Sequence, residues 1–134
     1  MRMVVFALFA SVFLFAGNAR ADETADFSGT WMWSEGQESF VMTLKQQGDK
    51  VAGTHTAVGQ EGAKADDGLD VAGPTIAGVV KGDTAVVTFH TAFPDSDGHG
   101  TATMVKHGDI LDWEITSSDG EHYLPKKALM KFSP

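Results

Sequence analysis

The chain has 134 residues, no cysteine, and 18 acidic against 10 basic residues, which gives a formal net charge of −8. This length suits a single domain, and the lack of cysteine excludes disulfides, thiolate-bound zinc and a cysteine nucleophile. The acidic balance argues against nucleic acid and anionic lipid surfaces as partners, because both bind proteins through cationic side chains.

The first 21 residues have the three parts of a secretory signal peptide. Arg2 makes the start positive, residues 3–16 are almost continuously apolar, and Ala19-Arg20-Ala21 has the small-x-small pattern of a cleavage site. The apolar run is shorter than the roughly 20 residues of a membrane-spanning helix, which favours cleavage over an uncleaved N-terminal anchor. We therefore expect a periplasmic or secreted protein, with a signal peptide at residues 1–21 and a single β-barrel domain at residues 22–134.

Cleavage would change the charge of the protein further. Loss of Arg2 and Arg20 leaves eight lysines against all 18 acidic residues, a net charge of −10 and no arginine. Without arginine there are no guanidinium forks for phosphate or carboxylate substrates. The negative charge can serve solubility alone, or it can steer a basic partner toward an acidic surface.

After residue 21 the pattern is that of an all-β protein. Runs rich in Val, Thr, Ile and aromatic residues predict eight strands, at residues 28–33, 39–46, 50–57, 75–80, 84–91, 100–106, 110–117 and 122–132. Tight hairpin turns are predicted between neighbouring runs, at Gly48-Asp49, Gly82-Asp83, Asp97-Gly98, Gly108-Asp109 and Asp119-Gly120. The one long connection, residues 59–74, is acidic and rich in glycine, a composition that suits a functional or mobile loop.

Side chains alternate between two faces along these runs. The apolar face predicts a core that contains Trp31, Phe40, Met42, Leu44, Val87, Phe89, Leu111, Trp113 and Ile115. One apolar and one polar face, with hairpins between consecutive strands, predicts an antiparallel up-and-down barrel or flattened barrel of about eight strands.

The first predicted strand carries Gly29-Thr30-Trp31. A Gly-x-Trp at this place resembles the start of the calycin barrels, which include the lipocalins, fatty-acid-binding proteins and avidins. The resemblance implies that Trp31 plugs the closed end of a barrel and that a late basic residue, here Lys131, packs over it. We assign Trp31, Trp33 and Trp113 to the core, with an aromatic-lined ligand pocket as the alternative.

A second likeness lies near the C-terminus, at Gly120-Glu121-His122-Tyr123. Its Gly-x-x-Tyr spacing resembles small exported bacterial β-barrels that inhibit lysozymes, several of which insert a Ser-Gly-x-x-Tyr loop into the cleft of the enzyme. Asp119 stands here in place of that serine, and Ser117 and Ser118 precede it. The resemblance implies a partner-binding loop.

The sequence contains no spacing typical of a catalytic or metal site. The five histidines lack metal-ligand spacing and are expected to be solvated, although His90 and His99 could approach each other across one loop. Residues 95–98 resemble the opening of a calcium loop whose remainder is missing. Asp112 and Glu114 fall on the predicted polar face, whereas glycosidase chemistry needs a desolvated acid. We therefore expect a protein that is not an enzyme and uses no metal or cofactor.

Two functions remain open. The first is a non-catalytic binding protein of the inhibitor or immunity type, which engages a basic protein partner such as a lysozyme-like cell-wall hydrolase through loops at one barrel end. The loops at residues 93–99 and 117–123 should open at the same rim, and their expected contact residues are Phe93, Asp95, Asp97, His99, Ser118, Asp119, Gly120 and Tyr123. The alternative is a calycin-type carrier of a small apolar ligand in the barrel lumen, lined by Trp31, Trp33 and Trp113. Neither function involves membrane insertion after cleavage.

Overall fold

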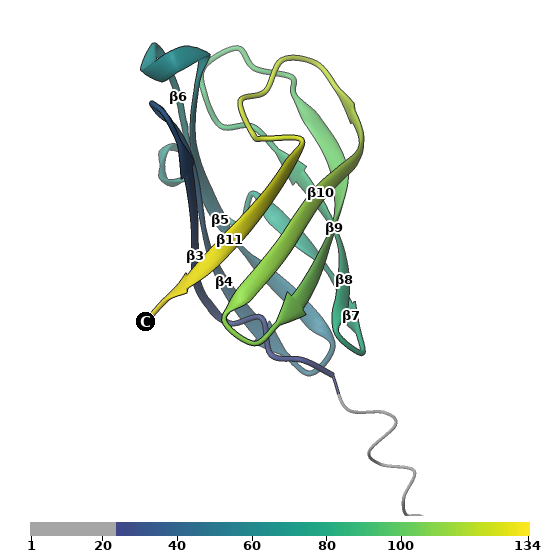
Figure 1. The fold of residues 1–134 in the computed structure, drawn as a ribbon. Coiled ribbons are helices and arrows are strands. Elements are labelled where there is room, and N and C mark those ends of the chain that lie inside the picture. Colours follow the sequence, from purple (N-terminus) through teal and green to yellow (C-terminus); the bar gives the residue numbers. More distant parts are fainter. Residues whose placement is uncertain (1–23) are drawn as a thin grey trace, which may run out of the picture.

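The computed structural model describes residues 24–134, so the predicted signal peptide lies outside the described residues. Eight strands close an antiparallel barrel and a ninth extends its wall (Figure 1), which confirms the predicted fold class. The strands are β3 (Gly29–Glu35), β4 (Glu38–Gln47), β5 (Lys50–Gly59), β6 (Lys64–Asp67), β7 (Ile76–Lys81), β8 (Thr84–His90), β9 (His99–His107), β10 (Ile110–Asp119) and β11 (Lys127–Ser133). No helix within residues 24–134 has the length and apolar character to cross a membrane.

The barrel closes through pairing of the first and last strands, β3 with β11. Within the wall, β5 has two partners on the same edge: residues 50–53 pair with β7, and residues 56–59 pair with β6. The short 3-10 helices η1 (Gln60–Gly62) and η2 (Gly68–Asp70) flank β6. β6 lies within residues 59–74, which were predicted as one long connection, because its four residues include neither a β-branched nor an aromatic side chain.

Three of the five predicted hairpin turns are confirmed. Gly48, Gly82 and Gly108 each open a two-residue connection and have φ of 61° to 64°, the position where a type II′ turn requires glycine. A further tight turn begins at Gly36, with φ of 63°, between β3 and β4.

The predictions at the other end of the barrel were wrong in detail. Gly98 ends a longer connection, residues 91–98, and Gly120 begins another, residues 120–126. The last strand starts at Lys127 rather than at residue 122. Residues 122–124 fold over the barrel end, with Leu124 in the core and Tyr123 packed against it, and Pro125 has no N–H with which to extend the ladder.

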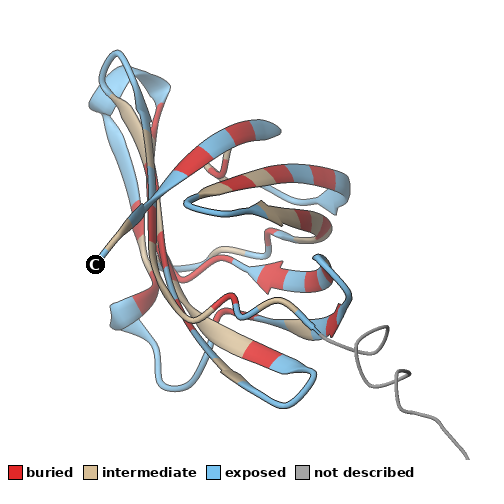
Figure 2. Cartoon of the chain, turned by 60° about the horizontal axis from the view of Figure 1, so that its bottom comes forward, coloured by how far each residue is buried: buried red, intermediate tan, exposed pale blue. Residues whose placement is uncertain are grey.

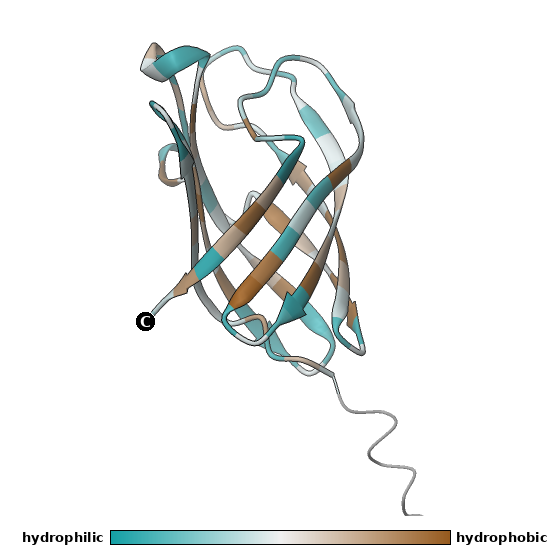
Figure 3. Cartoon of the chain, viewed as in Figure 1, coloured by the Kyte–Doolittle hydropathy of each residue, from teal (hydrophilic) through white to brown (hydrophobic). Residues whose placement is uncertain are grey.

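Inward-facing side chains fill the barrel. All nine predicted core residues are at most 4% exposed, and buried and exposed positions alternate along the strands (Figure 2), as do hydrophobic and hydrophilic residues (Figure 3). Trp113 lies at the centre of this core, with its ring centroid 4.8 Å from that of Phe40 and 6.1 Å from that of Phe89. Its indole Nε1–H donates to the carbonyl of Pro125 at 2.9 Å, which ties the core to residues 120–126.

Residues 24–28 close the end of the barrel that carries the tight Gly-Asp turns (Figure 1). The N–H of Ala25 donates to the carbonyl of Gly82 in the β7–β8 turn. The side-chain amide of Gln46 accepts from the N–H of Phe27 and donates to the carbonyl of Ala25. Phe27 is fully buried as a result.

Trp31 lies at this closed end. Its Nε1–H donates to the carbonyl of Phe27 at 3.0 Å, and its ring meets that of Phe132 edge-on, with centroids 5.3 Å apart. Phe132 therefore covers Trp31, and the expectation for Lys131 was wrong, because Lys131 is exposed and pairs with Met32. Gly29 has a φ of 130°, and a Cβ there would collide with the Phe132 ring, so the Gly-x-Trp motif has a local packing reason.

Candidate functional site

The end opposite residues 24–28 carries the long connections, and two of them lie side by side there (Figure 1). The rings of Phe93 and Tyr123 stack with centroids 5.0 Å apart and planes inclined by 25°. A side chain at Gly98 would collide with the backbone of Glu121, and one at Gly120 would meet Asp97. Residues 91–98 and 120–126 therefore form one surface, which we call the rim.

The eight expected contact residues all lie at the rim or on the strand ends beside it. Phe93 and Tyr123 are half-buried, whereas the other six are exposed. His99 pairs with Asp119 across the ends of β9 and β10. These positions put an ordered aromatic pair at the centre and polar groups around it.

Tyr123 is held by three neighbours. Besides stacking on Phe93, it packs so closely on Gly59 that a Cβ there would come within 3.0 Å of its own Cβ. Its hydroxyl donates to Oε2 of Glu121 at 2.9 Å. Burial, and then the Glu121 carboxylate, raise the pKa of Tyr123 above its ordinary value, so the hydroxyl remains a neutral hydrogen-bonding group.

Carboxylates are numerous at the end of the barrel that carries the rim. Those that reach solvent near the rim and the neighbouring turns are Glu35, Glu38, Glu61, Asp67, Asp70, Asp95, Asp97, Asp119 and Glu121, and the lysines at this end are Lys64, Lys126 and Lys127. At the opposite end, Lys45, Lys50, Lys81, Lys106 and Lys131 accompany Asp26, Asp49, Asp83 and Asp109. The negative charge of the described chain is thus concentrated at the rim end.

His122 belongs to the second loop of the rim, and its ring packs on the core. Its ring meets Phe89 edge-on with centroids 5.5 Å apart, and its Nδ1 is buried with no hydrogen-bond partner among residues 24–134. Burial lowers the pKa of His122 below 6.5, while the Leu124 backbone and the charge of Asp66 act in the opposite direction. The folded protein therefore disfavours the charged imidazolium at this place.

Acidification should consequently weaken the fold through His122. When the pH falls below about 6.5, the unfolded chain takes up the proton first, so the free energy of unfolding decreases until the folded-state pKa is also passed. The variant His122→Gln should lose less stability than the wild type between pH 8 and pH 5. Urea unfolding midpoints of both proteins at the two pH values test this, and equal losses would contradict it.

A buried polar cluster lies where β6 leaves the barrel wall. His55 Nε2 is 2.7 Å from Asp66 Oδ2, and His55 Nδ1 is 2.8 Å from the hydroxyl of Thr75. Asp66 Oδ1 accepts from the N–H of Ala92 at 2.7 Å, which joins β6 to the first loop of the rim. His55, Asp66 and Thr75 are at most 2% exposed, so the expectation of a solvated His55 was wrong. His55 lies on the same face of β5 as Val51 and Ala57, which are both buried. The alternation of side chains along this strand would therefore have indicated that His55 is buried.

The order carboxylate, imidazole, hydroxyl in this cluster is that of a hydrolase triad. However, the Thr75 hydroxyl is only 1% exposed, so a substrate has no path to it. The hydroxyl accepts from the backbone N–H of His55 at 3.2 Å. A tautomer with the ring proton on Nε2, facing Asp66, lets the hydroxyl donate its hydrogen to Nδ1. Every polar atom of the three side chains is then satisfied, and the cluster acts as an internal clamp on residues 64–75.

The remaining histidines show no such burial. His90 and His99 do pair across β8 and β9, as expected. Yet ring nitrogens of His90 lie within hydrogen-bond distance of the Pro74 and Thr91 carbonyls, and His99 contacts its own loop at Asp97. Over residues 24–134, no three His, Asp or Glu side chains are grouped so that they could hold a metal ion.

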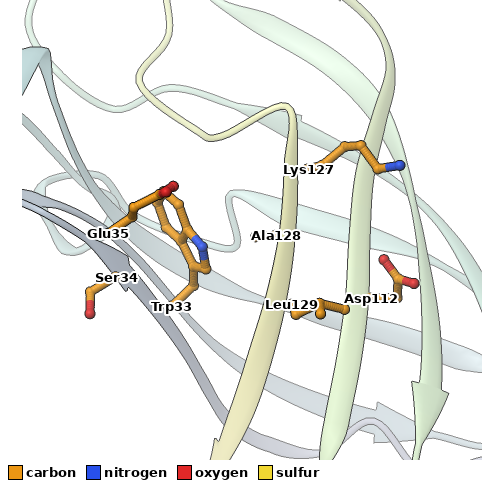
Figure 4. A pocket seen from close by; sticks show the side chains of 7 residues that line it. All are labelled: Trp33, Ser34, Glu35, Asp112, Lys127, Ala128 and Leu129. Carbon is orange, nitrogen blue, oxygen red and sulfur yellow. The ribbon is translucent and has the colours of Figure 1, made fainter.

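A groove opens on the side of the barrel where β3 and β11 diverge (Figure 4). It has a volume of about 620 Å³ and is lined by Trp33, Ser34, Glu35, Asp112, Lys127, Ala128 and Leu129. Of the three tryptophans considered for a lumen pocket, Trp31 and Trp113 are fully buried, whereas Trp33 is half-buried and lines this groove. No pattern in the sequence predicted this groove.

The rim and the groove both place aromatic side chains beside charged ones. A barrel of this kind supports many unrelated functions, so function has to be argued from these sites rather than from the fold. The chain matches no family model, and neither a curated protein nor a solved structure matches it.

Proposed function

We propose that this protein is an exported, non-catalytic binding protein that engages a basic protein partner through the rim. The observation that carries the proposal is the Phe93–Tyr123 stack, an ordered aromatic pair placed among carboxylates. Tyrosine is enriched among the residues that dominate binding energy at interfaces. A lysozyme-like cell-wall hydrolase is the partner to test first, because the Gly120-x-x-Tyr123 spacing resembles the inhibitory loop of lysozyme-inhibitor barrels.

The uneven distribution of charge supports the same proposal. Carboxylates at one end of a molecule attract a cationic partner over distances set by ionic screening, roughly 8–10 Å in physiological salt. Such steering raises the association rate more than it raises affinity, and it orients the partner toward the charged end. The rim end would thus meet a basic enzyme first.

The filled interior favours a protein partner over a carried ligand. The inward-facing side chains of the barrel form one continuous cluster of contacting buried residues. A barrel of about eight short strands has an interior just wide enough for side chains to fill. A carrier would instead need open volume between Trp31 and Trp113.

Titration of animal and bacterial lysozymes with the purified protein tests the proposed function. We expect hydrolysis of cell-wall substrate to fall at low salt, and inhibition to weaken as salt is raised to physiological strength. Inhibition of none of these enzymes, together with apolar molecules that co-purify with the barrel, would reject the proposal in favour of the carrier.

Tyr123→Ala should weaken inhibition by at least tenfold, since hot-spot truncations cost about 2 kcal/mol or more. Tyr123→Phe keeps the ring on Phe93 and Gly59 and loses only the hydroxyl bond to Glu121, so its effect should be smaller. Inhibition constants of the three proteins, measured with melting curves to confirm folding, provide the comparison. Equal inhibition by Tyr123→Ala and wild type would remove Tyr123 as the anchor.

Removal of equal charge from the two ends of the barrel tests whether the rim steers the partner. Asp95→Asn with Asp97→Asn removes two charges at the rim, and Asp49→Asn with Asp109→Asn removes two exposed charges at the opposite end. Only the rim pair should slow association with the lysozyme and reduce its salt dependence. If the two double variants slow association equally, net charge rather than the rim accounts for the attraction.

A further inference from the structure

The groove between β3 and β11 arises because their pairing stops halfway. The two strands pair through Thr30–Met32 and Lys131–Ser133, and then they separate toward the rim (Figure 1). Residues 33–35 of β3 stay paired with β4 on their other edge, and residues 127–130 of β11 stay paired with β10. Each strand therefore has one edge that no strand of the described chain covers.

The direction of the backbone groups on these edges follows from the bonds that are made. The carbonyl of Lys126 accepts from the N–H of Ile115 in β10. The N–H of Phe132 donates to the carbonyl of Asp109, in the turn that precedes β10. Alternate residues of an antiparallel strand direct their backbone groups to opposite neighbours, so Lys127 and Leu129 direct theirs toward β3. Lys131 also directs its backbone groups toward β3, where it is opposite Met32. Met32 therefore directs its backbone groups toward β11, and so does Ser34, two residues further along β3.

The side chains of the groove suit an added strand. Trp33 forms an aromatic floor on the β3 side, with its indole nitrogen turned toward β11 (Figure 4). The side chain of Leu129, with 63% of its surface exposed, extends from β11 toward Asp112. Two carboxylates, of Glu35 and Asp112, line the groove with one cation, Lys127. The open edges thus offer backbone donors and acceptors, an apolar floor and an excess of negative charge.

We propose that this groove binds an extended, basic peptide segment, which adds as a β-strand to the open edges of β3 and β11. An extended peptide backbone presents N–H and C=O groups at the same spacing as the open strand edges. Every second side chain of the peptide would then face Trp33. Lysine or arginine on the peptide complements Glu35 and Asp112. The site adjoins the rim, because Lys127 directly follows residue 126 and Trp33 lines a smaller hollow together with Tyr123. It uses the strand edges rather than the Phe93–Tyr123 pair, so it can exist whether or not the rim binds a lysozyme.

The probe is a synthetic heptapeptide in which lysine alternates with valine or phenylalanine. Its binding should slow amide hydrogen exchange at Ser34, Lys127 and Leu129, and leave exchange at Gly98 and Gly120 in the rim unchanged. Two control peptides carry N-methyl groups on every second backbone nitrogen, the first on the odd-numbered and the second on the even-numbered nitrogens. The methyl groups remove the N–H donors on one edge of the peptide and keep its side chains and charge. At least one of these control peptides should bind tenfold more weakly, as should the heptapeptide with glutamate in place of lysine.

A proline at position 129 tests the backbone contact from the protein side. Because the N–H of Leu129 faces the groove, Leu129→Pro removes no bond to β10, whereas Leu129→Ala removes only the side chain. Leu129→Pro should lower peptide affinity at least tenfold and Leu129→Ala should lower it less; Ser34→Pro serves if the first variant does not fold. No binding of the basic heptapeptide, N-methylated forms that both bind as tightly as the unmethylated heptapeptide, or exchange protection at the rim instead would overturn the proposal.

Discussion

Trp113→Ala is expected to lower the free energy of unfolding by about 3–5 kcal/mol, the usual cost of truncating a buried tryptophan. Trp113 is fully buried, its ring packs on Phe40 and Phe89, and its Nε1–H bonds the carbonyl of Pro125. The variant leaves a cavity in the core and an unpartnered carbonyl at the rim. For a domain of this size the thermal midpoint should fall by roughly 10–20 °C, which calorimetry measures directly.

One further variant separates packing from hydrogen bonding at Trp113, and another serves as a surface control. Trp113→Phe retains most of the packing and loses the bond to Pro125, so its cost should be about 1–3 kcal/mol. Leu129→Ala, at a largely exposed position, should stay within about 0.5 kcal/mol of the wild type. An unchanged melting curve for Trp113→Ala would show that the indole contributes nothing to the core and would make it a candidate binding residue.

Asp66→Ala should be comparably destabilising, at about 3–5 kcal/mol, because removal of one partner leaves the other polar groups buried and unpaired. The two groups affected are the imidazole of His55, 2.7 Å away, and the backbone N–H of Ala92. Since Ala92 belongs to the first loop of the rim, we also expect faster amide exchange in residues 91–98. Urea unfolding and hydrogen exchange together measure the global and local effects.

Asp70→Ala is the matched control for this variant. It removes a carboxylate from the same connection, but Asp70 is exposed, so its cost should be within about 0.5 kcal/mol. Asp66→Asn keeps an oxygen for the N–H of Ala92 and should retain part of the stability. Equal stability of the Asp66→Ala and Asp70→Ala variants would contradict a clamping role for the buried cluster.

The predictions that succeeded depended on information that is local in the chain. Alternation of apolar and polar residues reports which face of a strand is buried, so the core residues from Trp31 to Ile115 could be chosen without a structure. Glycine tolerates a positive φ wherever it occurs, so Gly48, Gly82 and Gly108 marked their turns. Counting hairpins also predicted that the loops at residues 93–99 and 117–123 open at the same end, and the connections found there are residues 91–98 and 120–126.

The features that could not be predicted depend on contacts between distant segments. Asp66 lies in a run with no strand pattern. It is buried because β5 changes partner from β7 to β6, which places Asp66 opposite Ala57 with its carboxylate 2.7 Å from the ring of His55. Residues 122–124 have a strand pattern, yet they fold over the barrel end because their apolar side chains find the core there. The groove beside Trp33 exists because closure pairs β3 with only half of β11. Local preferences thus specified the strands and their faces, whereas the geometry of closing the barrel decided which polar groups became buried and which edges stayed open.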